Sequence, residues 1–173
     1  RCYVSLVAEL EFYYDIVCPY AYLASTQIEA MAERHGASIT WRPFLLGGVF
    51  RSLAVPANLM GSLGPAKALN NLRDMARWAE TFDIPLSMPA AHPMRSVLAL
   101  RALLALPRER LVPATHRLFR TYWVENADIT RGDVVAGALI HAGCDGAAAV
   151  AAAESHLIKD KPVKDIILSK TAG

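Results

Sequence analysis

The sequence has few cysteines, and their spacing does not suit disulfide bonds. Among its 173 residues are three cysteines, Cys2, Cys18 and Cys144. An odd number at wide spacing does not build the kind of disulfide framework that stabilises small secreted domains. We therefore expect reduced thiols and a cytoplasmic protein. Cys2, in a terminal segment, and Cys144, just after a predicted helix end, are expected to be inert.

The chain also lacks clustered basic residues, long apolar runs and the spacing of metal ligands. Its 18 basic and 16 acidic residues are mixed along the chain and leave a net charge of +2, which argues against a nucleic-acid partner. The apolar runs are shorter than the roughly 18 residues that a membrane span needs, and no secretory signal is visible. The five histidines do not follow a metal-site pattern. With 54% apolar and 20% charged residues, the composition predicts one globular domain.

The most informative stretch that is present covers residues 10–25, LEFYYDIVCPYAYLAS. Apolar side chains alternate up to Ile16, which predicts a strand over about 9–16. Pro19 suits the first helical position, because its φ is already helical and its missing N–H would be unpaired there. This assigns Cys18 to the N-cap, facing free N–H groups and the positive end of the helix dipole. We predict a nucleophilic thiol with a depressed pKa; the alternative is a small apolar residue that fills the junction.

The pattern then changes from alternation to helical periodicity. A helix over 19 to about 35 and a strand over 38–46 complete a βαβ unit, with Pro43 marking a break or an edge late in the strand. Residues 51–64 are rich in Pro, Gly, Ser and Asn, which favours a loop. We therefore divide the chain into an N-terminal βαβ portion (1–50), a linker (51–64) and a helical portion (65–173).

Only helices are predicted from Pro65 onward. They are expected to cover about 65–82, 93–106, 112–124, 130–141, 145–156 and 162 to the end. The first is expected to bury four residues along one stripe: Leu69, Leu72, Ala76 and Ala79. Thr130, with Asp133 three positions later, forms a capping-box pattern, and Asp145 is a second predicted N-cap.

Residues 12–25, FYYDIVCPYAYLAS, resemble the opening of the thioredoxin-like superfamily that holds the DsbA-type oxidoreductases, the kappa-class glutathione transferases and the 2-hydroxychromene-2-carboxylate isomerases. The last two families match best, with a serine where Cys18 stands. Ala21 replaces the second cysteine of the redox motif C-x-x-C, so no local disulfide can form. The resemblance implies an α/β thioredoxin-like fold with a large all-helical insertion. It also implies a later β-hairpin preceded by a cis-proline, which we expect to lie outside this chain.

The resemblance also implies a glutathione site. In the kappa-type pattern an asparagine precedes a lysine by nine residues, as Asn58 precedes Lys67, and the following helix ends in a pair such as Ile84-Pro85. Asn58 and Lys67 would contact glutathione together with Pro19 and Tyr20. The stretch LLGG (45–48) adds to the likeness. A turn-forming asparagine and a solvated lysine are the alternative.

Other residues near this pattern have two interpretations each. The segment YWVE (122–125) resembles part of the isomerase insertion, so Tyr122 and Trp123, with Tyr22, are candidates for an aromatic-substrate pocket; packing in the core is the alternative for Trp123. Of Tyr20 and Tyr22, one is expected to face the site and the other the core. Asp15 either tunes the Cys18 thiol or structures the strand–helix junction.

These features predict a glutathione-dependent isomerase that acts on a conjugated aromatic compound, with Cys18 donating a hydrogen bond to the glutathione sulfur. The alternatives are a thiol-disulfide oxidoreductase that uses Cys18 as its single cysteine, a glutathione transferase, and a binding or scaffold protein without catalysis. Because a thiol is a weaker donor than a hydroxyl, Cys18 in place of serine bears directly on this choice. We expect a homodimer.

Overall fold

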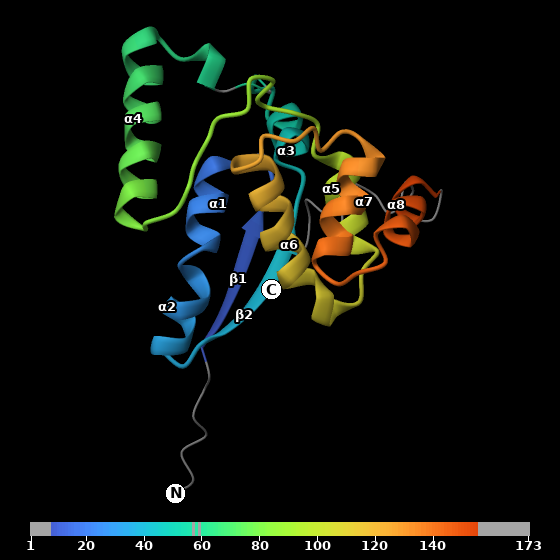
Figure 1. The fold of residues 1–173 in the computed structure, drawn as a ribbon. Helices are drawn as coiled ribbons and strands as arrows, with labels where there is room; N and C mark the ends of the chain where they lie inside the picture. Colours follow the sequence, from blue (N-terminus) through green and yellow to red (C-terminus); the bar gives the residue numbers. More distant parts are fainter. Residues whose placement is uncertain (1–7, 57, 59, 156–173) are drawn as a thin grey trace, which may run out of the picture.

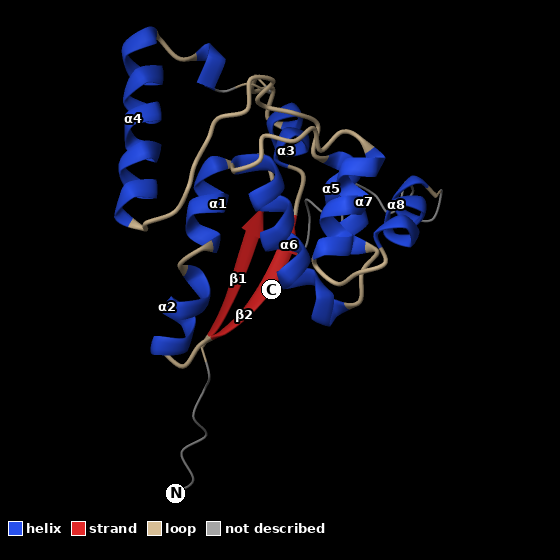
Figure 2. Ribbon diagram, viewed as in Figure 1, coloured by secondary structure: helices blue, strands red, loops and turns tan. Residues whose placement is uncertain are grey.

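The structure, a computed structural model, describes residues 8–56, 58 and 60–155. In this part of the chain, two parallel strands form the sheet. Strand β1 covers Glu9–Tyr14 and β2 covers Ser38–Pro43, paired so that Glu9 is opposite Ser38 and Tyr14 is opposite Pro43. Figures 1 and 2 show the two strands side by side. The predicted βαβ unit is confirmed, and Pro43 ends the second strand.

The two faces of the sheet differ as the alternation predicted. Phe12, Tyr14 and Trp41 are buried on one face and contact each other with ring centroids 4.9–5.5 Å apart. The other face is exposed, and there Glu11 forms an ion pair with Arg42 at 2.8 Å. Burying one apolar face while a polar face remains in water requires a helix layer on one side only.

The segment after β1 is two short helices instead of the one predicted. Helix α1 covers Pro19–Ser25 and α2 covers Ile28–Arg34. At the break, the hydroxyls of Ser25 and Thr26 donate to the carbonyls of Tyr22 and Leu23, at 2.7 and 2.8 Å. Hydroxyls that bond to the preceding turn compete with the regular helical hydrogen bonds, which explains the interruption.

A helix that the sequence did not predict lies between β2 and the linker. Helix α3 covers Leu46–Ser52, and a 3₁₀ turn follows at Met60–Ser62. The first N–H of α3, on Leu46, donates to the Asp15 carboxylate at 2.9 Å. Because this acceptor comes from a distant segment, no local pattern marks the start of the helix.

The regular elements in the rest of the described chain are helices, as predicted, joined by loops such as 82–96. They are α4 (Pro65–Thr81), α5 (Val97–Leu104), α6 (Arg108–Trp123), α7 (Gly132–His141) and α8 (Gly146–Glu154). Asp145 caps α8 by accepting from the Ala148 N–H at 3.0 Å, which confirms that prediction. The N-cap of α7 is Arg131 and not Thr130, whose hydroxyl donates instead to Asp128. The helix predicted from 162 onward lies outside the described residues.

Helix α6 is the central support of the fold. It packs on the buried face of the sheet, where Tyr14 contacts Phe119 at 5.8 Å between ring centroids and bonds to the Thr115 hydroxyl at 2.6 Å. Tyr122 and Trp123, at its end, are fully buried. Among the described residues, no helix combines the length and the apolar character that a membrane crossing requires.

Helix α4 lies apart from this core, beside α1 (Figure 1). Met75 and Ala79 face inward, whereas Leu69 and Leu72 are 47% and 42% exposed. The predicted buried stripe is therefore wrong except at Ala79. The error follows from the surroundings of α4, because a helix that touches one neighbour buries only a narrow strip of its surface.

Candidate active site

A cavity of about 470 Å³ opens where β1 ends. One wall consists of the β1–α1 junction and α3, and we call it the junction wall. A second wall is the segment 92–97, which leads into α5, and we call it the loop wall. Side chains of Asn58, Leu63 and Asn71 complete the rim. The volume lies within the range of about 300–1,000 Å³ that is typical of small-ligand sites.

Cys18 lies in the junction wall at the predicted N-cap position of α1, with its side chain half-buried. Burial raises the pKa of the Cys18 thiol; the N–H groups of Ala21 and Tyr20 lower it, and the charge of Asp15 raises it further. The prediction of a depressed pKa is therefore wrong. Helix α1 has seven residues, and the loss of solvent outweighs the two N–H groups at its start. A thiol in this setting is protonated near neutral pH.

Asp15 joins the two walls. Its side chain is 1% exposed and accepts hydrogen bonds from the Val17 N–H at 3.3 Å and the Leu46 N–H at 2.9 Å. The Ser96 hydroxyl of the loop wall donates to the same carboxylate. Burial raises the pKa of Asp15, while these donors oppose the increase. Both interpretations of Asp15 from the sequence are supported: it structures the junction, and its charge acts on the Cys18 thiol.

Pro19 and Tyr20 also line the cavity. The Tyr20 hydroxyl donates to Asp74 on α4 at 3.2 Å, so this side chain connects α1 to α4. Tyr22, two positions later, points the other way: it is buried, and its hydroxyl donates to the Pro85 carbonyl at 2.7 Å. The expectation that one of these two tyrosines faces the site and the other the core is confirmed.

Asn58 and Lys67, the predicted pair, differ in position. Asn58 lines the cavity, and its Oδ1 accepts the Gly61 N–H at 2.9 Å, which leaves its amide NH₂ as the free donor. Lys67 is exposed in the first turn of α4 and does not line the cavity. Asn71, one helical turn later on the same face, does line it. Lys67 therefore lies just outside the rim.

Three aromatic side chains predicted for a substrate pocket do not line this cavity. Tyr22, Tyr122 and Trp123 are 6%, 0% and 0% exposed and pack in the core. The pocket interpretation is therefore wrong for all three. The end of α6 buries Tyr122 and Trp123 in the core, and Tyr22 packs from α1 against Phe119 and Trp123. Trp123 supports both walls: its Nε1–H donates to the Ile16 carbonyl at 2.8 Å, and its ring lies 5.2 Å from that of His92.

The loop wall contains site residues that the sequence did not reveal. His92 and Met94 are held by the Tyr122 hydroxyl, which lies 2.9 Å from His92 Nδ1 and accepts the Met94 N–H at 3.2 Å. The peptide between His92 and Pro93 is cis. No pattern in the run HPMRS (92–96) marks a functional wall, because its role depends on packing against α6.

Two arginines bring positive charge to the cavity, and sequence reasoning missed both. Arg51 comes from α3 and Arg95 from the loop wall. Among the described residues, no carboxylate pairs with either guanidinium. Unpaired arginines on two walls of one cavity suit a ligand with carboxylate groups.

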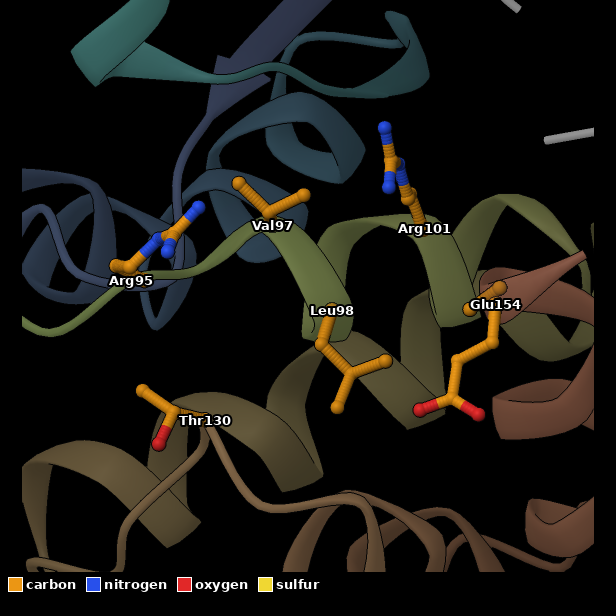
Figure 3. A pocket seen from close by; sticks show the side chains of 7 residues that line it. Arg95, Val97, Leu98, Arg101, Thr130 and Glu154 are labelled. Carbon is orange, nitrogen blue, oxygen red and sulfur yellow. The ribbon is translucent and has the colours of Figure 1, made fainter. Parts of the chain in front are cut away.

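A second cavity, of about 220 Å³, shares Arg95 and Val97 with the first. Figure 3 shows it from close by, between α5, α8 and the loop that carries Thr130. In this view the guanidinium of Arg101 and the carboxylate of Glu154 extend in opposite directions. The charged groups of Arg101 and Glu154 therefore do not converge on one point.

Comparison with known proteins identifies the family. The DSBA-like thioredoxin domain family matches residues 9–169, so the chain belongs to it. Glutathione S-transferase kappa 1 of Caenorhabditis elegans is 26% identical over 129 residues, which cover 69% of this chain and 56% of that protein. A 2-hydroxychromene-2-carboxylate isomerase of Pseudomonas sp. (strain C18) is 32% identical over 96 residues, covering 52% of this chain and 42% of that protein. The chain spans about half the length of these relatives.

A solved structure shows the same fold. That of a 2-hydroxychromene-2-carboxylate isomerase superposes with a TM-score of 0.69 at 22% identity, covering 87% of this chain and 74% of that one. The α/β thioredoxin-like fold with mostly helical content, and the likeness to kappa-class transferases and these isomerases, are therefore confirmed. The relatives are enzymes, named for an isomerisation and a glutathione transfer.

Proposed function

We propose that this member of the DSBA-like thioredoxin family is a glutathione-dependent isomerase of conjugated aromatic compounds. The observation that carries the proposal is the position of Cys18, a half-buried thiol whose pKa is raised by burial, in the wall of a cavity that also contains unpaired arginines. A protonated thiol can donate a hydrogen bond to another sulfur, whereas a thiolate would repel it. The relatives named above support the same choice.

The residues around the cavity fit glutathione, a tripeptide with two carboxylates and a thiol. Arg51 and Arg95 would hold the carboxylates, with Lys67 adding positive charge at the rim. The free NH₂ of Asn58 would donate to a peptide carbonyl. Tyr20 and Pro19 supply an apolar surface beside Cys18. When bound, glutathione supplies a thiolate that adds reversibly to a conjugated carbon, so that the former double bond can rotate before the thiolate leaves.

The contribution of the protein would be electrostatic and positional. Cys18 would hold the glutathione sulfur by its S–H, and the N–H groups that reach Cys18 orient its own sulfur. Burial, with a smaller contribution from the charge of Asp15, raises the pKa of the Cys18 thiol and so favours its protonated form. Asp15 would also join the two walls around the ligand. An aromatic substrate would occupy the apolar part of the cavity beside Leu45, Phe50 and Met94.

Two variants of Cys18 test the proposal. With glutathione and cis-benzylideneacetone, Cys18→Ser should isomerise at or above the wild-type rate, because a hydroxyl is the stronger donor. Cys18→Ala should lose about 10-fold or more, since a hydrogen bond to a charged group contributes about 1.5–3 kcal/mol. The product is followed by its ultraviolet absorption.

A parallel assay of insulin disulfide reduction addresses the oxidoreductase alternative. All three proteins should stay at background, because Ala21 leaves Cys18 without a resolving cysteine. Insulin reduction by wild type that Cys18→Ser abolishes, with no isomerisation by either protein, would overturn the proposal. A stable conjugate that retains the carbon–sulfur bond, detected by mass spectrometry, would instead identify a glutathione transferase.

A further inference from the structure

His92 has one nitrogen bonded to a core side chain and one without a hydrogen-bond partner among the described residues. It is half-buried in the loop wall, and its Nδ1 lies 2.9 Å from the hydroxyl of the fully buried Tyr122. One side of the ring contacts Trp123 at 5.2 Å between centroids. These contacts hold the imidazole in one orientation.

The hydrogen bonds of Tyr122 determine which nitrogen of His92 carries the proton. The Tyr122 oxygen already accepts the Met94 N–H at 3.2 Å. Its own O–H needs an acceptor, since burying an unpaired hydroxyl is unfavourable. Among the described residues, the acceptor within reach is His92 Nδ1. Nδ1 is therefore the acceptor, and the neutral ring carries its hydrogen on Nε2.

Nε2 is open to a ligand. Among the described residues it has no hydrogen-bond partner, yet it is not among the sealed, unpaired side-chain atoms, which are Arg117 Nε and Thr121 Oγ1. Because His92 lines the same cavity as Cys18, the exposed Nε2–H donates toward the space that a ligand would fill.

We propose that His92 is a further catalytic residue, whose Nε2–H donates a hydrogen bond to the carbonyl oxygen of a conjugated carbonyl substrate. The role rests on the proposed isomerase function. In such a substrate, addition at the conjugated carbon moves negative charge to the carbonyl oxygen, and a fixed neutral donor stabilises that charge without prior reorganisation. Cys18 would serve the sulfur and His92 the oxygen, since both line the same cavity.

The charged and titratable groups around His92 are consistent with a neutral ring. Tyr122 faces it from α6, while Asp15, Cys18 and Arg95 share the cavity. Burial lowers the pKa of His92. The ring then remains the single-tautomer donor at neutral pH.

The first test uses the ligand-free protein, so that it does not depend on the reaction. Nitrogen-15 NMR of wild type should show His92 as the Nε2–H tautomer. In Tyr122→Phe, which removes the donor to Nδ1, the two tautomers should mix. An Nδ1–H tautomer in wild type would overturn the proposal.

The second test measures turnover of cis-benzylideneacetone with glutathione. His92→Ala should lower kcat about 100-fold, and His92→Gln, which retains an N–H donor, should recover part of the loss. Unchanged kcat in His92→Ala would overturn the role. If wild type fails to isomerise, the proposed function fails. The contact with His92 is then still decided by the NMR signal of Nε2 on addition of benzylideneacetone. A shift of this signal supports the contact, and an unchanged signal refutes it.

Discussion

The two walls of the cavity differ in how they arise from the chain. The central part of the junction wall is the continuous segment from Asp15 to Tyr20. Its local structure, the end of a strand followed by an N-cap and a helix start, is determined by residues that are neighbours in sequence. The loop wall, residues 92–97, is held by contacts with α6 and with Asp15. Sequence reasoning found the Asp15–Tyr20 part of the first wall, but it missed α3 and the second wall. Local patterns therefore identify half of this site, and packing supplies the other half.

Both walls depend on the same buried residues. Trp123 contacts the chain just before Cys18 and also the ring of His92. Asp15 binds α3 on one side and Ser96 on the other. A site with two walls of different origin can keep its shape because these two side chains connect them. The following predictions perturb these connections first and the individual walls afterwards.

Trp123→Ala should have the largest effect, because it removes the common support of both walls. Replacing a fully buried tryptophan is expected to lower the free energy of unfolding by about 3–5 kcal/mol. The matched control is Trp78→Ala on α4, where the side chain is 45% exposed and the expected loss is under about 1 kcal/mol. Urea denaturation measures both, and equal losses would contradict the central place given to Trp123.

Asp15→Asn should separate the two roles of Asp15. In the variant, the amide NH₂ is a donor that faces one of the two N–H groups from which the carboxylate accepts a hydrogen bond. This hydrogen bond is lost, so the free energy of unfolding should fall by about 1–3 kcal/mol. Because the charge of Asp15 raises the pKa of Cys18, that pKa should fall in the variant. Iodoacetamide rates against pH measure it, with the exposed Asp133→Asn as control. An unchanged or higher Cys18 pKa would be inconsistent with the coupling.

Arg51→Gln and Arg95→Gln compare the walls directly. Each should weaken glutathione binding about fivefold, since a partly exposed charge pair contributes up to about 1 kcal/mol. Because the two residues come from separate segments, the double variant should lose about the product of both. Lys67→Gln, at the rim, should lose less than either. Calorimetry measures the affinities. If Lys67→Gln had the largest effect, the carboxylate-binding site would have to lie closer to α4 than proposed.

The smallest effect concerns pH and the loop wall alone. Burial lowers the pKa of His92 from its ordinary 6.5, so between the folded pKa and 6.5 the unfolded chain binds more protons at this residue. The contribution of His92 to stability should therefore rise with pH through this window and be lost as pH falls through it. The difference in unfolding free energy between wild type and His92→Gln, measured against pH, isolates it. A difference that falls with rising pH would contradict the direction.

Particular residues show how far the sequence could predict the site. Pro19 and the alternation before it predicted β1, the Cys18 N-cap and the start of α1. The Asn58–Lys67 spacing led to one residue in the cavity and one outside the rim. Tyr122 was predicted as a pocket residue and is instead the buried support of one wall. The pKa of Cys18 was predicted in the wrong direction, because the sequence shows the helix start but not the burial.

By itself, the sequence determined the elements whose causes are local: two alternating strands, a proline-started helix after Cys18 and a series of helices after Pro65. Only the tertiary structure decided which side chains surround the cavity and in what protonation state. Trp123 reaches the Ile16 carbonyl across 107 positions of sequence, and Tyr122 meets His92 across 30. Desolvation and long-range hydrogen bonds set the protonation states of Cys18, Asp15 and His92. Both effects arise only when the distant segments pack together.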